Sequence, residues 1–382
     1  MPAREYDAIL LTGFGGPEGQ DDVIPFLRNV TAGRGIPDER LEEVAHHYRA
    51  FGGVSPINQQ NRDLKAALEA EITARGLGLP VYWGNRNWDP YLADVLKDAH
   101  ANGHTRLLAL VTASFSSYSG CRQYREDLAK AIADAGLEGK IEVDKVRQYF
   151  DHPGFVNPNI DAVLGGLREL AAGRDGAADG DAAPHVMFAT HSIPLSASDA
   201  SGPREGLPDG TPVATGEAGG WYAEQQRAVA RLIMAAVAQE FPEAQWSLVY
   251  QSRSGAPHMP WLEPDINDAI VALPESVTGL VISPIGFVSD HMEVKWDLDT
   301  EALETAAERG LAAVRVPTVG IDPAFVSGLI DLVEERHATA DAPDGAERKS
   351  LSDLGPWQDV CPADCCLGRE LRPVVAQAQA LA

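Results

Sequence analysis

The stretch Asp7-Ala-Ile-Leu-Leu-Thr-Gly-Phe-Gly-Gly-Pro17 joins a short apolar run to a glycine-rich segment. An apolar run that ends in glycines and a proline predicts a buried strand followed by a loop. Further apolar runs in the first half predict strands at residues 81–84, 106–113 and 141–146. Helical periodicity between them predicts helices that begin at Pro37, carry Leu64 to Ile72, and span residues 124–135.

The same alternation continues in the second half. It predicts strands at residues 185–190, 246–251, 280–283 and 312–316, and helices at residues 222–241, 290–309 and 322–337. Residues 171–184 are a low-complexity stretch and residues 338–350 a polar linker. We expect an α/β protein with two Rossmann-like domains, each a parallel sheet flanked by helices. The predicted divisions are residues 1–160, 161–320 and 321–382, the last being a helix and tail that return to the first domain.

The composition limits the possible partners. The 382 residues include 31 Lys and Arg against 56 Asp and Glu, a net charge of −25. A strongly acidic surface repels phosphate groups, which argues against nucleic acid and anionic membrane surfaces. We find no apolar run near the roughly 20 residues that cross a bilayer, and no signal-peptide pattern at the N-terminus. The expected location is the cytoplasm, without membrane insertion.

The glycine-rich segment from Gly13 to Gly19 has two interpretations. It follows a predicted strand, as a phosphate-binding loop does. However, Pro17 removes a backbone donor, and no Lys-Ser or Lys-Thr pair follows. A loop that lets another flat ligand approach the backbone closely is at least as well supported.

A histidine follows the predicted strand at residues 185–190, within the sequence Thr190-His-Ser-Ile-Pro194. Ligands of open α/β sheets gather at the carboxyl ends of strands, where His191 is well placed for proton transfer. The alternative is a histidine that only holds the loop by hydrogen bonds.

Three carboxylates recur every four residues in the predicted helix at residues 290–309. Glu293, Asp297 and Glu301 share one helical face, interrupted in the run only by Lys295. A solvated acidic face is the ordinary interpretation. Hard oxygen ligands at successive heights also suit a path for a divalent cation, and a Glu293 that faces His191 would join a metal ligand to a proton acceptor.

All four cysteines of the chain fall into two places. Cys361, Cys365 and Cys366 lie near the C-terminus, and Cys121 lies far upstream. Four thiolates match either tetrahedral zinc or an iron–sulfur cluster. Common zinc spacings are absent, and adjacent cysteines are compatible with a two-iron cluster, so we favour a 2Fe-2S cluster over zinc or unrelated buried thiols. The tail must then return to the loop that bears Cys121.

Together these motifs resemble the ferrochelatase family over nearly the whole chain. The resemblance rests on residues 11–17, 51–56, 190–194, 250–253, 260–262 and 286–293. The His-Ser-Ile-Pro and Asp-His-x-Glu signatures in this order are highly specific, whereas the glycine-rich loop is not. The resemblance implies two Rossmann-like domains with a porphyrin cleft between them, insertion of Fe²⁺ into a porphyrin, and a monomer.

Several residue roles are implied by this resemblance. His191 and Glu293 match the facing pair at the metal-insertion site, and Asp297 and Glu301 match the acidic path behind it. Porphyrin-carboxylate contacts are matched by Ser55 and Tyr124. The cluster ligands match Cys121, Cys361, Cys365 and Cys366, in the style of the actinobacterial members.

The resemblance also points to a substrate. Cluster-bearing members without membrane anchoring use coproporphyrin III, so we expect Fe²⁺ insertion into coproporphyrin III. Phe14 departs from the soluble coproporphyrin branch of low-GC Gram-positive bacteria, in which a tyrosine can ligate iron. The sequence leaves open from which face of the ring the metal enters.

Four other functions remain open at this level. They are a protoporphyrin IX ferrochelatase, a cobalt chelatase for a sirohydrochlorin-like ring, a non-catalytic haem or iron–sulfur carrier, and a dinucleotide-dependent oxidoreductase. Trp88, Trp261 and the long two-domain chain favour iron and a porphyrin over the cobalt chelatase. A simple carrier would not need an acidic ladder opposite a strand-end histidine.

Overall fold

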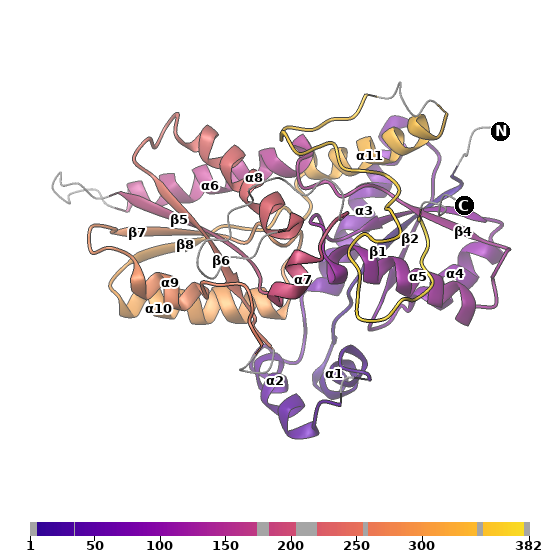
Figure 1. Ribbon diagram of the computed structural model, residues 1–382, viewed down its shortest axis with the longest axis horizontal. Helices are drawn as coiled ribbons and strands as arrows, with labels where there is room; N and C mark the ends of the chain where they lie inside the picture. Colours follow the sequence, from indigo (N-terminus) through magenta and orange to yellow (C-terminus); the bar gives the residue numbers. More distant parts are fainter. Residues whose placement is uncertain are drawn as a thin grey trace.

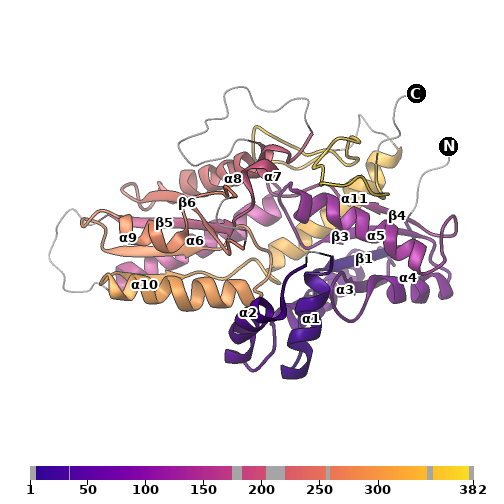
Figure 2. The same ribbon diagram turned by 60° about the horizontal axis from the view of Figure 1, so that its bottom comes forward.

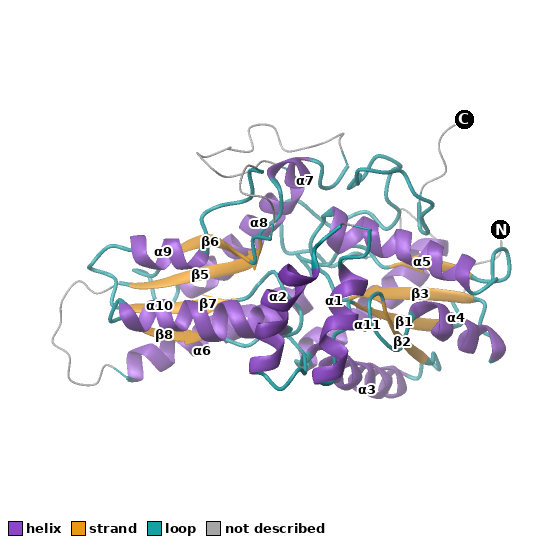
Figure 3. Ribbon diagram, turned by 90° about the horizontal axis from the view of Figure 1, so that it is seen from below, coloured by secondary structure: helices purple, strands orange, loops and turns teal. Residues whose placement is uncertain are grey.

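The computed structural model describes residues 6–33, 35–173, 183–203, 220–254, 259–341 and 347–377. Its two four-stranded parallel sheets lie side by side, each flanked by helices (Figures 1 and 3). The α/β architecture with two parallel sheets is therefore confirmed. Most of the low-complexity stretch at residues 171–184 lies outside the described residues.

The first sheet has the strand order β2-β1-β3-β4. Its central strand β1 alternates its side chains between two buried clusters: Ile9 and Leu11 face one, Ala8 and Leu10 the other. Burial of both faces explains why the strand is continuously apolar. The strands are β1 (Ala8–Gly13), β2 (Val81–Asn85), β3 (Arg106–Val111) and β4 (Glu142–Lys145).

The second sheet has the equivalent order β6-β5-β7-β8. On its central strand β5, Val186 and Phe188 join the cluster that contains Ile9 and Leu11, so one apolar core runs through both halves of the molecule. The strands are β5 (Pro184–His191), β6 (Gln245–Gln251), β7 (Gly279–Ser283) and β8 (Ala312–Arg315). All eight predicted strands are present within one or two residues of their expected limits.

Helices connect the strands, and those at Leu92–Ala101, Pro153–Ala172 and Ile266–Ala272 were not predicted from the sequence. Helices α1 and α2 project from the body of the molecule below the two sheets (Figures 1 and 2). The helix α3 ends at Gly76, whose φ of +69° is easily reached by glycine. The α-helices are α1 (Val23–Val30), α2 (Asp38–Ala50), α3 (Ile57–Arg75), α4 (Leu92–Ala101), α5 (Gln123–Asp134), α6 (Pro153–Ala172), α7 (Leu195–Asp199), α8 (Trp221–Val237), α9 (Ile266–Ala272), α10 (Leu303–Glu308) and α11 (Pro323–Asp341). Shorter or wider helical turns are the 3₁₀-helix η1 (Gln20–Asp22) and the π-helices η2 (Tyr118–Arg122) and η3 (Val294–Ala302).

One sequence prediction is wrong in its geometry. The segment at residues 290–309 is not one α-helix but the π-helix η3 followed by α10. The wider hydrogen-bonded turn of a π-helix occurs mostly as a local feature at functional sites. Carboxylates spaced for an α-helix therefore lie on a wider turn than the sequence alone indicated.

The C-terminal part of the chain returns to the first sheet. Helix α11 packs against both α3 and α6, and the tail that follows it runs beside α5 (Figures 1 and 2). Helix α11 extends to Asp341, beyond the start of the predicted linker at residue 338. The predicted domain limits at residues 160 and 320 stay predictions. None of the helices in the described part of the chain combines the length and apolar character that a bilayer-spanning segment requires.

Candidate active site

The candidate site forms where the strands of the second sheet end. His191 is the last residue of β5 and pairs in register with Gln251, the last residue of β6. The main-chain N–H of Ser192 donates a 2.8 Å hydrogen bond to the carbonyl of Gln251, which fixes the two strand ends together. The segment after β7 brings Glu293 to the same edge, which is the usual ligand-binding edge of an open α/β sheet.

His191 and Glu293 face each other directly. The distance from His191 Nε2 to Glu293 Oε2 is 3.6 Å. His191 Nδ1 is hydrogen-bonded to the carbonyl of Ser192, and because a carbonyl only accepts, Nδ1 carries the proton. The neutral imidazole then directs the lone pair of Nε2 toward the carboxylate. This tautomer can accept a proton or ligate a metal at Nε2.

Each side chain of the pair favours the charged form of the other. Burial opposes ionisation of both groups, but the Glu293 carboxylate outweighs it and raises the pKa of His191. For Glu293, burial would raise the pKa, yet the charges of His191 and His291 bring it down to about 2. The side chains keep 32% and 49% of their surface exposed, so the facing atoms remain accessible. The site therefore combines an ionised carboxylate with a histidine that readily takes up a proton.

Asp297 lies one step further along the acidic path. Its Oδ2 accepts hydrogen bonds from Gln251 Nε2, at 3.2 Å, and from the Ser252 hydroxyl. Burial, and after it the charge of Glu293, raises the pKa of Asp297 to about 7. A carboxyl group with this pKa exchanges protons near neutral pH.

Glu301 is separated from this group by its orientation. Its side chain is exposed, and Oε1 accepts a 2.8 Å hydrogen bond from Trp296 Nε1. The structure therefore brings His191, Glu293 and Asp297 together, while Glu301 stands at the outer end of η3. Its part in a metal path stays a prediction.

The two predicted porphyrin contacts are buried in the first half of the molecule. Ser55 is packed so closely against the glycine-rich loop that a Cβ on Gly16 would lie 2.7 Å from the Ser55 Cβ. Tyr124 is on α5, with the Arg86 guanidinium 4.4 Å from its ring centroid. Their predicted contacts with porphyrin carboxylates stay predictions.

The four cysteines form one buried cluster, although Cys121 is 240 residues from Cys361 in sequence. The sulfur atoms of Cys365 and Cys366 are 3.8 Å apart, and no cysteine is in a disulfide. Backbone N–H of Gly202 donates to Cys366 Sγ at 3.0 Å, and Gln358 Nε2 donates to Cys365 Sγ at 3.7 Å. Such donors stabilise sulfur ligands of iron–sulfur clusters.

The predicted return of the tail to Cys121 is thus confirmed, and the four sulfurs provide the donor set of a 2Fe-2S cluster. In their present positions, no three His, Cys, Asp or Glu side chains of the described chain are arranged to hold a metal ion. The cluster itself stays a prediction.

Comparison with known proteins identifies the family. The ferrochelatase family model matches residues 6–337. The chain belongs to the ferrochelatase family. A coproporphyrin III ferrochelatase of Leifsonia xyli is 60% identical, over 97% of this chain and 94% of the relative. A coproporphyrin III ferrochelatase of Streptomyces griseus is 55% identical, over 98% of this chain and 96% of the relative. A ferrochelatase of Rhodopirellula baltica is 47% identical, over 97% of this chain and 96% of the relative.

Two further residues of the candidate site were missed from the sequence. His291 Nδ1 lies 3.8 Å from Glu293 Oε2, so the carboxylate stands between two imidazoles. In the sequence, the only signal for His291 is its position in the Asp-His-Met-Glu motif. Tyr48 is on α2 next to His47, which stacks on Trp296 of η3 with ring centroids 4.1 Å apart. Burial, and after it the charge of Glu293, raises the pKa of Tyr48. Tyr48 followed the apolar stripe of its helix and gave no functional signal.

Tyr48 belongs to an aromatic group beside the site. Phe26 is at its centre, with ring centroids 5.9 Å from Tyr48, 6.1 Å from Trp88 and 6.3 Å from Phe14. Such a group gives a flat aromatic ligand an apolar wall. Phe14 of the glycine-rich loop contributes to this group by packing.

Another family motif supports the histidine loop. The carbonyl of Ile193 accepts a hydrogen bond of 3.0 Å from the N–H of Leu262, and Ser192 Oγ donates to the Leu262 carbonyl at 2.9 Å. Trp261 and Pro194 form an antiparallel bridge between these contacts. The Pro-Trp-Leu segment therefore holds the loop that follows His191.

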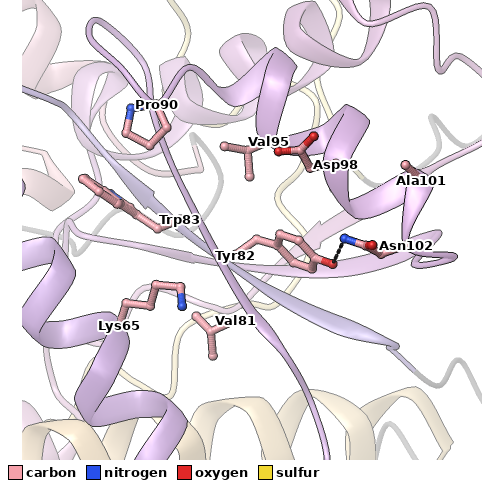
Figure 4. Close-up of a pocket in the computed structure, with 9 residues that line it drawn as sticks. All are labelled: Lys65, Val81, Tyr82, Trp83, Pro90, Val95, Asp98, Ala101 and Asn102. Atoms are coloured by element: carbon pink, nitrogen blue, oxygen red, sulfur yellow. Dashed lines mark hydrogen bonds between the residues drawn. The ribbon is translucent and has the colours of Figure 1, made fainter.

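A separate pocket of about 500 Å³ lies along β2, at the edge of the first sheet (Figure 4). In it, Tyr82 accepts a 3.2 Å hydrogen bond from Asn102 Nδ2. It is lined by Lys65, Val81, Tyr82, Trp83, Pro90, Val95, Asp98, Ala101 and Asn102. None of the predicted site residues lines this pocket.

Proposed function

We propose that this chain inserts Fe²⁺ into coproporphyrin III and so produces the iron complex coprohaem. The observation that carries the proposal is the opposition of His191 Nε2 and Glu293 Oε2 at the carboxyl edge of the second sheet. The names of relatives that are 55–60% identical over nearly the full chain support the choice of coproporphyrin III.

The chemistry requires a proton acceptor and a metal ligand at one place. A free porphyrin carries two inner N–H protons, and both leave as the four ring nitrogens bind Fe²⁺. In our proposal, Fe²⁺ leaves His191 Nε2 as the ring nitrogens bind it, and the freed lone pair then accepts the first proton. Asp297, with a pKa of about 7, accepts the second at neutral pH.

Fe²⁺ as substrate is first bound by His191 and Glu293. The ionised Glu293 attracts the cation, and imidazole and carboxylate are both suitable ligands for divalent iron. Glu301, exposed at the outer end of η3, is the proposed first contact for iron arriving from solvent. Asp297 lies between it and the facing pair.

The porphyrin is placed in a cleft between the proposed domains, residues 1–160 and 161–320, with residues 321–382 supporting the first domain. Ser55 and Tyr124 are proposed to bind its carboxylates. Binding energy from these remote groups is available to bend the ring, so that pyrrole lone pairs turn toward the metal. The Phe26 aromatic group supplies an apolar wall for the macrocycle.

For the tail, we propose that Cys121, Cys361, Cys365 and Cys366 bind a 2Fe-2S cluster with a structural or sensing role. The supporting observation is that these thiols, and no others in the chain, are buried together. A monomer in the cytoplasm, without membrane insertion, completes the proposal.

The test is an anaerobic assay with Fe²⁺ and either coproporphyrin III or protoporphyrin IX, monitored by loss of porphyrin fluorescence. We expect faster turnover of coproporphyrin III, and loss of turnover in His191→Ala with porphyrin affinity retained within a few-fold. His185→Ala is the matched control, because His185 lies at the other end of β5, bonded to Ser247 at 3.0 Å.

Each alternative result has a distinct meaning. Preference for protoporphyrin IX would keep the reaction but overturn the substrate. Tight porphyrin binding without turnover of either ring would favour the carrier. Near-normal turnover in His191→Ala would disprove the role of His191.

A further inference from the structure

Two cationic side chains are buried near the cysteine cluster without a carboxylate partner among the described residues. Arg125 on α5 has no exposed surface, and Lys145 at the end of β4 is 3% exposed. Burying a cation without a counter-charge is strongly unfavourable. The fold therefore needs a negative charge close to both.

Arg125 lies directly between α5 and the cysteine-bearing tail. It follows Cys121 by four residues, and its Nε donates a 3.0 Å hydrogen bond to the carbonyl of Val375. The N–H of Val375 donates back to the Arg125 carbonyl, and Gln377, two residues on, bridges to Cys361. Both terminal nitrogens, Nη1 and Nη2, are fully buried and have no hydrogen-bond partner in the part of the chain that the structure describes.

Lys145 lies behind the turn that bears Cys121. Gln148, which accepts a hydrogen bond from Lys145, donates to the Phe115 carbonyl at 2.8 Å, and that oxygen would lie 3.1 Å from a Cβ on Gly120. Lys145 Nζ donates to the carbonyl of Val146 and to Gln148 Oε1, both at 2.7 Å. These acceptors are neutral, so they solvate the ammonium group but leave its charge unbalanced.

A third buried cation in the same region shows what pairing would look like. Arg122 forms a 3.0 Å ion pair with Glu126, and both side chains are 3% exposed or less. Its Nη1 also donates to the carbonyls of Ala363 and Cys365. Arg122 is thus neutralised within the protein, unlike Arg125 and Lys145.

We propose that Arg125 and Lys145 are the counter-charges of the cluster bound by the four cysteines. This inference rests on the proposed 2Fe-2S cluster. An oxidised two-iron core carries two positive charges and its four thiolates carry four negative ones, so the whole bears two net negative charges. Arg125 and Lys145 balance them. The Nη groups of Arg125 are the donors of hydrogen bonds to these sulfurs.

The proposal has two measurable consequences. Reduction adds a third net negative charge, so losing either cation lowers the reduction potential of the cluster. In protein that lacks the cluster, the same two cations are buried without compensation, so removing one stabilises the fold. An ordinary packing role would destabilise both forms alike.

The experiment compares Arg125→Met and Lys145→Met with wild type and with Arg125→Lys, which keeps the charge. Arg168→Met is the control, because Arg168 is exposed and paired with Glu240. Iron and labile sulfide per chain, the midpoint potential from a redox titration followed by visible circular dichroism, and the thermal midpoint are measured. Each substitution is repeated in a chain whose four cysteines are replaced by serine.

We expect a lower potential and lower cluster content in both Met variants, near-wild-type values in Arg125→Lys and the control, and a raised thermal midpoint in the serine background. Unchanged potentials, or equal destabilisation in both backgrounds, would overturn the counter-charge role. If Arg125→Met fails to fold, the potentials and thermal midpoints of Lys145→Met and Arg125→Lys test the counter-charge role instead. Wild-type protein without iron and labile sulfide would overturn the cluster proposal itself.

Discussion

The hydroxyl of Tyr222, on α8, donates a 2.9 Å hydrogen bond to the main-chain oxygen of His191. The same phenol oxygen lies 3.0 Å from Thr190 Oγ1, which accepts from Gln226 Nε2 at 2.9 Å. The last two residues of β5 are therefore held by side chains of one helix. Since ring position follows backbone position, α8 sets the direction in which His191 Nε2 points.

Tyr222→Phe removes this hydroxyl without changing the ring. We expect the free energy of unfolding to fall by about 1 kcal/mol, because a buried carbonyl loses its partner. We expect kcat to fall more than the porphyrin affinity, because His191 loses its alignment. Chemical denaturation and the anaerobic assay measure the two effects. Tyr82→Phe, at the edge of the first sheet, is the control, and an unchanged kcat in Tyr222→Phe would contradict the positioning role.

His291 provides a contrast with His191. Its Nδ1 lies 3.8 Å from Glu293 Oε2, and burial lowers its pKa, so we expect a neutral imidazole that orients the carboxylate. Removal of a group that orients a metal ligand typically costs about 10–100-fold in affinity. We therefore expect His291→Ala to raise KM for Fe²⁺ by roughly tenfold while turnover at saturating iron persists. Complete loss of turnover, as in His191→Ala, would show that His291 itself takes part in the chemistry.

Asp297 gives the reaction a predicted pH dependence. Burial, and then the charge of Glu293, raises its pKa to about 7, so it is largely protonated below pH 7 and ionised above it. Only the ionised form attracts Fe²⁺ and accepts a proton. We expect kcat/KM for Fe²⁺ to rise with pH through about 7, and Asp297→Asn to flatten this rise.

The neighbouring Asp299 is the control for this pH profile. It is held by Arg315 at 2.8 Å and by Lys295, and these partners lower its pKa against the effect of burial. Asp299→Asn should keep the rise through pH 7. If Asp297→Asn retained the wild-type profile, another group would have to be the titrating one.

The sequence predicted the strands well because most of them contain buried apolar runs, which leave little choice of structure. The edge strands β4 and β8 are shorter and less buried. The sequence also predicted the pairing of His191 with Glu293 and the return of the tail to Cys121, because strand ends and scarce thiols restrict where chemistry can occur. The π-helix η3 was not predictable in this way. Its residues have ordinary helical composition, and the change of hydrogen-bonding pattern depends on packing.

The sequence likewise did not show which buried charged side chains have a partner of opposite charge. Arg122 and Arg125 are three residues apart on neighbouring turns, yet one has Glu126 as a partner and the other has unpartnered terminal nitrogens. The Arg122–Glu126 pair is local, at i and i+4, whereas the surroundings of Arg125 depend on the tail, whose Val375 carbonyl accepts from Arg125 Nε. Tyr48 came to lie near Glu293 for the same reason: contacts between distant segments follow from tertiary structure.

His152 predicts how stability depends on pH. Burial, and after it the charge of Arg147, lowers its pKa from 6.5 to about 4. The unfolded chain therefore binds more protons between pH 6.5 and 4, so stability is complete above pH 6.5 and falls as the pH drops through this window. Between pH 7 and pH 5 we expect a loss of about 1–2 kcal/mol from this residue, since one pKa unit corresponds to roughly 1.4 kcal/mol.

His152→Asn keeps an acceptor for the N–H of Gly154, which His152 Nδ1 caps at 3.1 Å, but removes the titrating group. Urea denaturation at pH 7 and pH 5 should therefore show a smaller loss in the variant than in wild type. His185, whose pKa burial also lowers to about 4, accounts for a second part of the slope. The double variant His152→Asn, His185→Asn should be flatter again, because the two sites are independent. Equal pH slopes in all three proteins would mean that neither histidine is kept neutral by the fold.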